Sequence, residues 1–466
     1  MGNRKKRAAL HNLGCKVNAY ETEAMGQSLL EAGYELVPFD EEAEVYLINT
    51  CSVTNMADRK SRQMLHRARK RNPEAVIVAA GCYVQAQAEE LLKSGDADLI
   101  IGNNQKGRLV GLLTEYEEKR YAKESGPQAG DGSSGRRKTE VCAVLDLTHE
   151  KEYEELSLLK TAEHTRAFIK IQDGCNQFCS YCIIPYTRGR IRSRRPEDIL
   201  AEIRRLAGAG YREVVLTGIH LSSYGKDFER PVPLLTVIGQ VAEVEGIERI
   251  RLGSLEPRIV TEEFVRGLSA ISKVCPHFHL SLQSGCDQTL RRMNRHYTTQ
   301  EYAACCELLR SYYEHPAITT DVIVGFPGET EEEFETTLSF LERISFYEMH
   351  VFKYSKRQGT KAAAMGSQVP EEVKTNRSHR ALALSARLSG DFRKYYEGKV
   401  RGILLEEEQE IGGRRHMTGF TKEYVKAAVE LSDPAAREAL VPGRILPVRL
   451  SGRREAGWEG LLFAEP

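Results

Sequence analysis

The sequence lacks long apolar runs: no uninterrupted stretch reaches the ~18 residues that a membrane span needs. Met1 leads into the basic segment Asn3 to Arg7, with no long apolar segment behind it. The chain also has no net charge at neutral pH, because 66 Lys and Arg residues balance 66 Asp and Glu residues. The overall field therefore does not draw the chain onto a polyanion, and only local patches can. We expect a cytoplasmic protein without a membrane contact.

Low-complexity sequence is nearly absent too. With 41% hydrophobic and 28% charged residues, the composition excludes collagen-like, disordered and disulfide-scaffold classes for the whole chain. The 466 residues exceed one ordinary core and predict about three domains. Eleven cysteines are an odd number, and cytosolic thiols stay reduced. Closely spaced cysteines therefore indicate metal or cluster ligation before disulfides.

Residues 1–118 alternate short apolar runs with amphipathic stretches, which predicts a doubly wound α/β domain. The expected strands are Ala8 to Asn12, Val45 to Asn49, Ala75 to Ala80 and Asp98 to Ile101. The expected helices are Ala19 to Glu31, Met56 to Arg71, Gln85 to Leu92 and Lys106 to Leu113. A linker over 119–160 follows, in which Tyr121 to Lys138 is rich in Gly and Ser and too polar to bury a core.

Residues 161–393 repeat a strand and helix pattern about six times, which predicts a partial or complete parallel barrel. The expected strands are Ala167 to Ile171, Glu213 to Thr217, Arg249 to Gly253, His277 to Leu282, Thr319 to Val324 and His350 to Tyr354. In residues 394–466 the pattern changes to short strands with turn residues, which indicates a small β-barrel. Its expected strands are Val400 to Glu407, Met417 to Thr421, Glu423 to Val429 and Ile445 to Ser451.

Three closely spaced cysteines, Cys175, Cys179 and Cys182, follow the first strand of the predicted parallel barrel. Parallel barrels place their chemistry in such loops, and three thiolates can hold three corners of a four-iron cube. The fourth iron is then open to a substrate atom. Packing cysteines on a helix are the simpler reading, but Gly174 and the polar neighbours do not continue an apolar period. A zinc knuckle needs a fourth Cys or His nearby, and none lies between Ile183 and Ile219.

This motif, with Tyr181 before its last cysteine, resembles that of the radical S-adenosylmethionine (SAM) enzymes. The resemblance implies that the open iron chelates SAM and that electron transfer yields a 5′-deoxyadenosyl radical, which the protein positions and shields. Segments after later strands resemble the SAM contacts of that family. Together with Tyr181, the implied contacts are Gly218, His220, Ser254, Glu256, Gln283, Gly325 and Phe326. Each segment alone fits an ordinary turn, but all of them follow strand ends.

A second triplet, Cys15, Cys51 and Cys82, follows three predicted strands of the first domain. Isolated cysteines are usually buried small hydrophobes. The carboxyl ends of neighbouring parallel strands, however, frame one crevice, so distant cysteines can converge on one cluster. Small and polar flanking residues predict exposed loops.

These segments, with Asn12 to Asn18 and Tyr20, Glu21 and Glu23, resemble the radical SAM methylthiotransferases, most closely the branch that acts on N6-threonylcarbamoyladenosine (t6A) in tRNA. The resemblance implies two [4Fe-4S] clusters, the second on Cys15, Cys51 and Cys82, and two SAM molecules per turnover. It also implies methylthio transfer to C2 of t6A at position 37 of tRNA, next to the anticodon, and an electron donor. Isopentenyladenosine and a ribosomal-protein aspartate are the alternative substrates. Cys286, where the family often has serine, and Val84 are departures outside the clusters.

Basic tracts flank both cysteine triplets, and a phosphate polymer needs such cations. The candidate RNA contacts are Arg59, Lys60, Arg62, Arg188, Arg190, Arg192 and Arg194. Charge runs are more often solvated faces.

The last ~70 residues resemble the TRAM domain, an RNA-binding barrel. In this barrel Phe420 and Tyr424 are candidates either for base stacking, worth about 1 to 3 kcal/mol for each residue, or for the hydrophobic core. The rival from another class is a non-catalytic, metal-containing RNA-binding protein.

Overall fold

The computed structural model describes residues 4–124, 141–158, 165–432, 438–452, 455, 457–458 and 460–465. The chain forms two compact units. The first consists of residues 1–161, 172–194 and 355–360, and the second of residues 162–171, 195–354 and 361–466. In the described part, no helix combines the length and the apolar character that crossing a bilayer requires.

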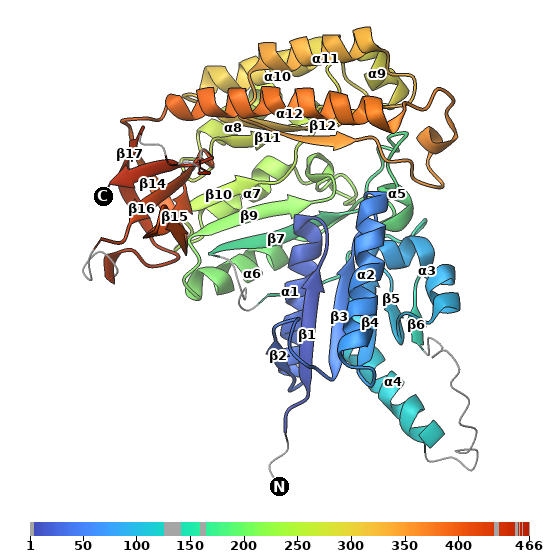
Figure 1. The fold of residues 1–466 in the computed structure, drawn as a ribbon. Coiled ribbons are helices and arrows are strands. Elements are labelled where there is room, and N and C mark those ends of the chain that lie inside the picture. Colours follow the sequence, from blue (N-terminus) through green and yellow to red (C-terminus); the bar gives the residue numbers. More distant parts are fainter. Residues whose placement is uncertain are drawn as a thin grey trace. The chain divides into compact units, whose positions relative to one another are not determined.

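The first unit contains a parallel six-stranded sheet in the order β2-β1-β3-β4-β5-β6 (Figure 1). Its strands are β1 (Arg7–Asn12), β2 (Glu35–Val37), β3 (Val45–Thr50), β4 (Val76–Gly81), β5 (Leu99–Ile101) and β6 (Val141–Ala143). Its helices are α1 (Lys16–Glu31), α2 (Asn55–Arg71), α3 (Cys82–Ser94), η1 (Lys106–Arg108) and α4 (Leu109–Glu124). The unit also holds the short elements α5 (Ile184–Thr187) and β8 (Arg192–Ser193).

Strand β3 shows why this sheet is covered on both sides. Val45 and Leu47 pack in one core with residues of α1 and α4, whereas Tyr46 and Ile48 pack in another with residues of α2 and α3. Successive side chains of a strand point to opposite faces, so an unbroken apolar run needs helices on both. The predicted doubly wound α/β domain is confirmed.

The sequence patterns missed β2 and β6, which are three residues long. Helix α4 continues to Glu124, and β6 pairs with β5, so parts of the predicted linker belong to this unit. The rest of its Gly- and Ser-rich segment lies outside the described residues.

The second unit contains two sheets of parallel strands. They are formed by β7 (Arg166–Asp173, which continues into the first unit), β9 (Glu213–Gly218), β10 (Arg249–Leu252), β11 (His277–His279), β12 (Ala317–Val324) and β13 (Glu348–Lys353). An isolated parallel bridge between Leu255 and Leu280 continues the first sheet into the second. All six predicted strands are present, in the order of a partial barrel.

Helices separate these strands along the chain, and two begin with reciprocal caps, at Thr298 with Glu301 and at Thr330 with Glu333. Such caps satisfy the first amide groups of a helix and fix where it starts. The helical elements are α6 (Pro196–Gly208), η2 (Leu221–Ser223), α7 (Leu234–Ala242), η3 (Pro257–Ile259), α8 (Glu262–Ser269), α9 (Asp287–Arg292), α10 (Thr299–Tyr312), α11 (Glu331–Ile344), η4 (Lys361–Ala364) and α12 (Glu371–Lys394).

The C-terminal residues close into a small barrel in the order β14-β15-β16-β18-β17 (Figure 1). Its strands are β14 (Val400–Ile411), β15 (Arg414–Phe420), β16 (Lys426–Glu430), β17 (Ile445–Ser451) and β18 (Leu462–Glu465). The predicted barrel is confirmed, and β18 was not predicted. Trp458 packs against the barrel cluster of Ile411, Ala428, Leu461 and Phe463.

Candidate functional site

Cys15, Cys51 and Cys82 follow the carboxyl ends of β1, β3 and β4, which are neighbours in the sheet. Cys15 immediately precedes α1 and Cys82 is the first residue of α3. Helix N-termini carry a partial positive charge that favours thiolates. The sheet order reverses beside β1, where ligands of such folds bind. The three cysteines therefore share one edge, as the sequence predicted.

Two glycines let the three loops approach closely. Gly14 has φ +108°, and a Cβ there would lie 2.9 Å from the Sγ of Cys51. Gly81 has φ +98°, and a Cβ there would lie 2.6 Å from the carbonyl oxygen of Thr50. Both positions need a left-handed backbone and have no room for a side chain, so glycine is required at each.

The cysteine loops are more buried than the sequence predicted. Cys15 is exposed, but Cys51 is only 5% and Cys82 only 4% exposed. The segment 172–194 of the same unit covers this edge, and Asn103 connects the two. Its amide nitrogen lies 3.6 Å from the Sγ of Cys82 and 2.7 Å from the carbonyl oxygen of Thr187. The prediction of exposed loops was wrong for Cys51 and Cys82, because a distant part of the chain packs on them.

Desolvation controls the protonation of two of these thiols. Burial raises the pKa of Cys51 to about 12, to which the nearby Cys82 contributes. The protein around the Cys15 thiol raises the pKa of Cys15 as well, although the residue as a whole is exposed. Buried neutral thiols are inert at neutral pH. A metal or cluster that binds here must displace the protons, and its own positive charge provides the driving force.

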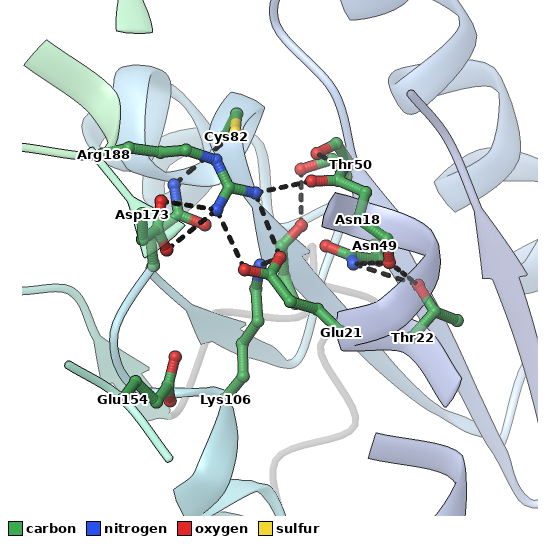
Figure 2. A network of polar contacts seen from close by, with 12 residues as sticks. Asn18, Glu21, Thr22, Asn49, Thr50, Cys82, Lys106, Glu154, Asp173 and Arg188 are labelled. Atoms are coloured by element: carbon green, nitrogen blue, oxygen red, sulfur yellow. Dashed lines mark hydrogen bonds and ion pairs between the residues drawn. The ribbon is translucent and has the colours of Figure 1, made fainter. Parts of the chain in front are cut away.

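Arg188 lies beside this cysteine edge and is fully buried (Figure 2). Its guanidinium group donates to Glu21 at 2.9 and 3.0 Å, to both Asp173 oxygens at 3.1 Å, and to Asn18 at 2.6 Å. Burial opposes its charge, but Asp173, Cys82 and Glu21 raise the pKa of Arg188 further above its ordinary value. Arg188 is thus a permanent cation next to the thiols. Lys106 makes a second ion pair with Glu21.

Cys175, Cys179 and Cys182 lie in the loop after β7, in the same compact unit as the first triplet. Gly174 has φ +69°, and a Cβ there would lie 1.8 Å from the carbonyl oxygen of Arg190, so only glycine fits. The amide of Gln177 donates to the Sγ of Cys175 at 3.4 Å. Amide donors of this kind stabilise cluster thiolates and tune their potential.

Neither cysteine triplet, among the described residues, draws its donor atoms together as closely as ligands of one zinc ion. A tetrahedral zinc with ~2.3 Å bonds needs its sulfur ligands about 3.8 Å apart. Among the described residues, three ligating side chains with all donor atoms within 4.8 Å of one another occur at His279, Asp321 and His350, and at neither cysteine triplet. Three cysteines without a fourth protein ligand fit an open four-iron cube.

The predicted SAM contacts follow consecutive strands of the second unit. Gly218 ends β9 and His220 lies two residues beyond it, while Ser254 and Glu256 follow β10. Gln283 follows β11, and Gly325 and Phe326 follow β12. Phe326 is buried edge-on against Tyr354. The carboxyl ends of parallel strands are where barrels bind substrates, so the positions agree with the prediction, whereas contact with SAM stays a prediction.

His220 and Glu256 approach each other at this end of the sheet. Burial, with the nearby cations Arg295 and Lys226, lowers the pKa of His220 to about 4. The imidazole is therefore neutral at neutral pH. Its 3.7 Å separation from the Glu256 carboxylate is a polar contact rather than an ion pair.

Glu329 fixes the loop after β12, and its raised pKa predicts a pH-dependent stability. Its carboxylate accepts the Gly325 amide at 2.6 Å and pairs with Arg377 at 2.9 Å, while burial raises the pKa of Glu329 to about 7. Because the folded pKa exceeds the unfolded value, this contribution is complete below about pH 4.5 and is lost as the pH rises through 7. We expect the loss of this contribution to reduce the free energy of unfolding by roughly 3 kcal/mol between pH 4.5 and pH 7.

Anaerobic urea unfolding of the wild type and of Glu329→Gln between pH 5 and pH 8 measures this effect. The difference between the two proteins should change with pH in the direction given above. Parallel curves for the two proteins would contradict the raised pKa.

The two residues predicted to stack on RNA bases, Phe420 and Tyr424, contact other protein side chains instead. The Phe420 and Tyr424 rings stack on each other at 4.5 Å, and the Tyr424 ring stacks on His277 of β11 at 4.8 Å. The Arg166 guanidinium lies 5.0 Å from both rings. Base stacking by these two residues is contradicted, because their ring faces hold the barrel against the parallel sheet of the same unit.

The basic tracts divide into buried and exposed residues. Arg188, Arg192 and Arg194 are at most 2% exposed, so the prediction that they bind phosphates is wrong. Arg192 donates to the carbonyl oxygens of Arg188 and Arg190, and Arg194 pairs with Glu155. RNA contact stays a prediction for the exposed Arg59, Lys60 and Arg190, and for the half-buried Arg62, which donates to the hydroxyl of Tyr83 at 3.2 Å.

Sequence reasoning missed the carboxylates that partner Arg188. Asp173, two residues before Cys175, was the available signal, because an acidic residue beside a cysteine motif is expensive unless a cation pairs with it. It also missed Glu213, which pairs with Arg251 at 2.8 Å inside the second unit. The sequence signal for this pair was the alternation of Arg249 and Arg251 with apolar residues in one predicted strand, because buried arginines need an acidic partner.

Comparisons with known proteins agree with this arrangement. Residues 169–341 match the Radical SAM superfamily, and residues 7–102 match Uncharacterized protein family UPF0004. The fold resembles TsrM from Kitasatospora setae, a radical S-adenosylmethionine methyltransferase, with a TM-score of 0.53, 14% identity and 75% coverage of both chains. This structural likeness concerns the fold alone.

Closer relatives exist among curated proteins. The chain is 42% identical to the threonylcarbamoyladenosine tRNA methylthiotransferase MtaB of Bacillus subtilis, over 90% of this chain and 89% of the relative. MtaB of Aquifex aeolicus is 39% identical over 86% and 94%. The tRNA-2-methylthio-N(6)-dimethylallyladenosine synthase of Caldicellulosiruptor saccharolyticus is 38% identical over 84% and 80%. The chain belongs to the radical SAM methylthiotransferase family.

Proposed function

We propose that this protein transfers a methylthio group to C2 of N6-threonylcarbamoyladenosine, next to the anticodon of tRNA, and that it acts in the cytoplasm, where tRNA is found. The two MtaB relatives, whose names give this substrate, are 42% and 39% identical to the chain. Residues 1–118 would carry the second cluster, residues 161–393 the radical chemistry, and residues 394–466 an RNA contact. An external electron donor is required.

We assign one [4Fe-4S] cluster to Cys175, Cys179 and Cys182, and a second to Cys15, Cys51 and Cys82. When bound, the first would supply, with SAM, the radical that removes the C2 hydrogen, and the second would hold the sulfur to be transferred. Both triplets belong to one compact unit, and this observation carries the proposal. A reactive carbon radical must meet its target and the sulfur donor without intervening solvent.

The chain's own residues prepare this site. The buried Arg188 offsets the negative charge that six thiolates bring to one unit. Asn103 bridges the second-cluster cysteine Cys82 and the loop that follows the first cluster. Gly14 leaves room for the Cys51 thiol, while Gly81 and Gly174 let their loops pass close to the backbone of Thr50 and Arg190. We propose that these contacts hold the loops of the two triplets in place.

Nucleoside mass spectrometry of tRNA tests the function. In cells that lack this gene, methylthio-t6A should disappear while t6A accumulates, and the wild-type gene should restore it. Cys82→Ala should not restore it. Cys142→Ala, a cysteine of β6 outside both triplets, is the matched control and should restore it fully. If methylthio-t6A persists undiminished without the gene and without a second enzyme, the substrate assignment is wrong.

Metal analysis of anaerobically purified protein tests the two clusters. The wild type should contain about eight iron atoms per chain, and Cys82→Ala about four, since each cube holds four. Reduced Cys82→Ala should still cleave SAM, because its first triplet is intact. A colourless wild type that contains zinc would instead support a non-catalytic RNA-binding protein.

A further inference from the structure

His279, Asp321 and His350 form a polar cluster on three adjacent parallel strands of the second unit, β11, β12 and β13. Asp321 lies opposite His350 in the ladder, and His279 lies opposite Thr319, two residues from Asp321 on the same face. Their donor atoms all lie within 4.8 Å of one another. The Nε2 of His279 is 3.3 Å from the Asp321 carboxylate, and its ring stacks on His350 at 5.7 Å.

The cluster lies on the open face of this sheet. The alternate residues Phe278, Ile318 and Met349 pack in a core with α10, α11 and α12. His350 is exposed, and Phe352, two residues further along β13, is 46% exposed. Because side chains alternate along a strand, the cluster and Phe352 face away from the helices. A ligand can therefore reach these side chains.

The cluster also lies next to the predicted SAM contacts of the same unit. The amide of Gln283 donates to the carbonyl oxygen of Asp321 at 2.9 Å. Gly325 follows Asp321 by four residues, at the end of the same strand. Parallel barrels bind substrates at this end of the strands. A group bound by the cluster would thus lie beside the reacting end of the barrel.

The relatives name two substrates that differ in the group on N6 of adenosine. Dimethylallyl is a hydrocarbon, whereas threonylcarbamoyl carries a carboxylate, a hydroxyl and urea N–H groups. Covering the exposed imidazole of His350 and the nearby Asp321 carboxylate with hydrocarbon would remove their water, which is costly. A polar substituent can replace the lost water, with the imidazoles as donors to its carboxylate and Asp321 as acceptor from its hydroxyl or N–H.

We propose that His279, Asp321 and His350 bind the threonylcarbamoyl group of the substrate and so select it over dimethylallyladenosine. Thr319 orients the pair, because its hydroxyl lies 3.0 Å from the Nδ1 of His279 and leaves Nε2 for Asp321 and the substrate. This inference deepens the proposed function and rests on it.

The test measures the binding of three synthetic anticodon stem-loops to the reconstituted enzyme by fluorescence anisotropy. They carry t6A, dimethylallyladenosine or unmodified adenosine at the target position. The wild type should prefer the t6A stem-loop. His350→Gln and Asp321→Asn, which are close in size to the native residues, should each lower the ratio of affinities for t6A over unmodified adenosine about 10-fold, the loss expected for one hydrogen bond to a charged group. His379→Ala, on the exposed surface of α12, is the control and should keep the ratio.

The possible outcomes separate this inference from the proposed function. A wild type without any preference for t6A would overturn both. A wild-type preference that persists in both cluster variants would overturn this inference alone. One divalent metal ion per chain, beyond the cluster iron, that disappears in the variants and is needed for t6A binding would also overturn it, since the cluster would then be a metal site. An increase in KM for t6A-tRNA in the variants, with little change in kcat, would support it.

Discussion

Replacing Arg188 by glutamine should lower the free energy of unfolding by about 3 kcal/mol, because it removes the main cation of two buried carboxylates and leaves Asp173 only the more distant Arg192, at 3.9 Å. Glu21 and Asp173 are at most 2% exposed, and Lys106 can compensate for Glu21 only. The same substitution removes the positive charge beside Cys82 and Cys15. We therefore also expect the iron content to fall from about eight towards about four atoms per chain.

Anaerobic urea unfolding measures the stability, and iron analysis with electron paramagnetic resonance measures the clusters. Arg190→Gln is the matched control: it removes the same charge two residues along the chain, at an exposed position. It should change the free energy of unfolding by no more than ~0.5 kcal/mol. An Arg188→Gln protein with wild-type stability and full iron would contradict the role assigned to this residue.

Replacing Glu213 by glutamine should loosen the C-terminal barrel within the second unit. Glu213 is fully buried, 2.8 Å from Arg251 and 3.5 Å from Arg249. The guanidinium group of Arg249 also donates to the carbonyl oxygens of Phe420 and Gly402 in the barrel. Without the carboxylate, two buried cations repel each other. We expect a loss of about 3 kcal/mol in the free energy of unfolding.

Hydrogen exchange by mass spectrometry can locate the effect of Glu213→Gln, which should accelerate exchange in strands β14 to β17. Glu248→Gln is the matched control, because Glu248 pairs with Arg212 on the surface, where both side chains are more than 40% exposed. An exposed pair contributes about 0.2 to 1 kcal/mol. Equal exchange in the two variants would show that the buried charges do not hold the barrel.

The elements that the sequence predicted well are those with strong local patterns. All four predicted strands of the first sheet and all six of the parallel barrel are present, because each carries a short apolar run with at least one buried face. The three-residue strands β2 and β6 were missed, because each contains an exposed residue, whereas all three residues of the equally short β5 are buried. Strand β18 was missed in the same way, with four residues and a barrel neighbour supplied from elsewhere in the chain.

The candidate sites divide in the same manner. The convergence of Cys15, Cys51 and Cys82 was predictable, because parallel strands place their carboxyl ends at one edge. The burial of Arg188 was not. A run of arginines resembles a solvated RNA-binding surface, and its partner Glu21 lies 167 residues away. The prediction that Phe420 and Tyr424 stack on bases failed for the same reason, since His277 and Arg166 contact these rings only in the folded chain.

The sequence by itself therefore determined the fold class, the two cysteine triplets and the family, because strand periodicity and ligand spacing are local properties. The tertiary structure decided which charges are structural and which are accessible. It turned Arg188 from a candidate RNA contact into a buried cation beside thiols, and it collected His279, Asp321 and His350 from three strands. The free energy of a charge depends on the groups that surround it, and these come from distant parts of the chain.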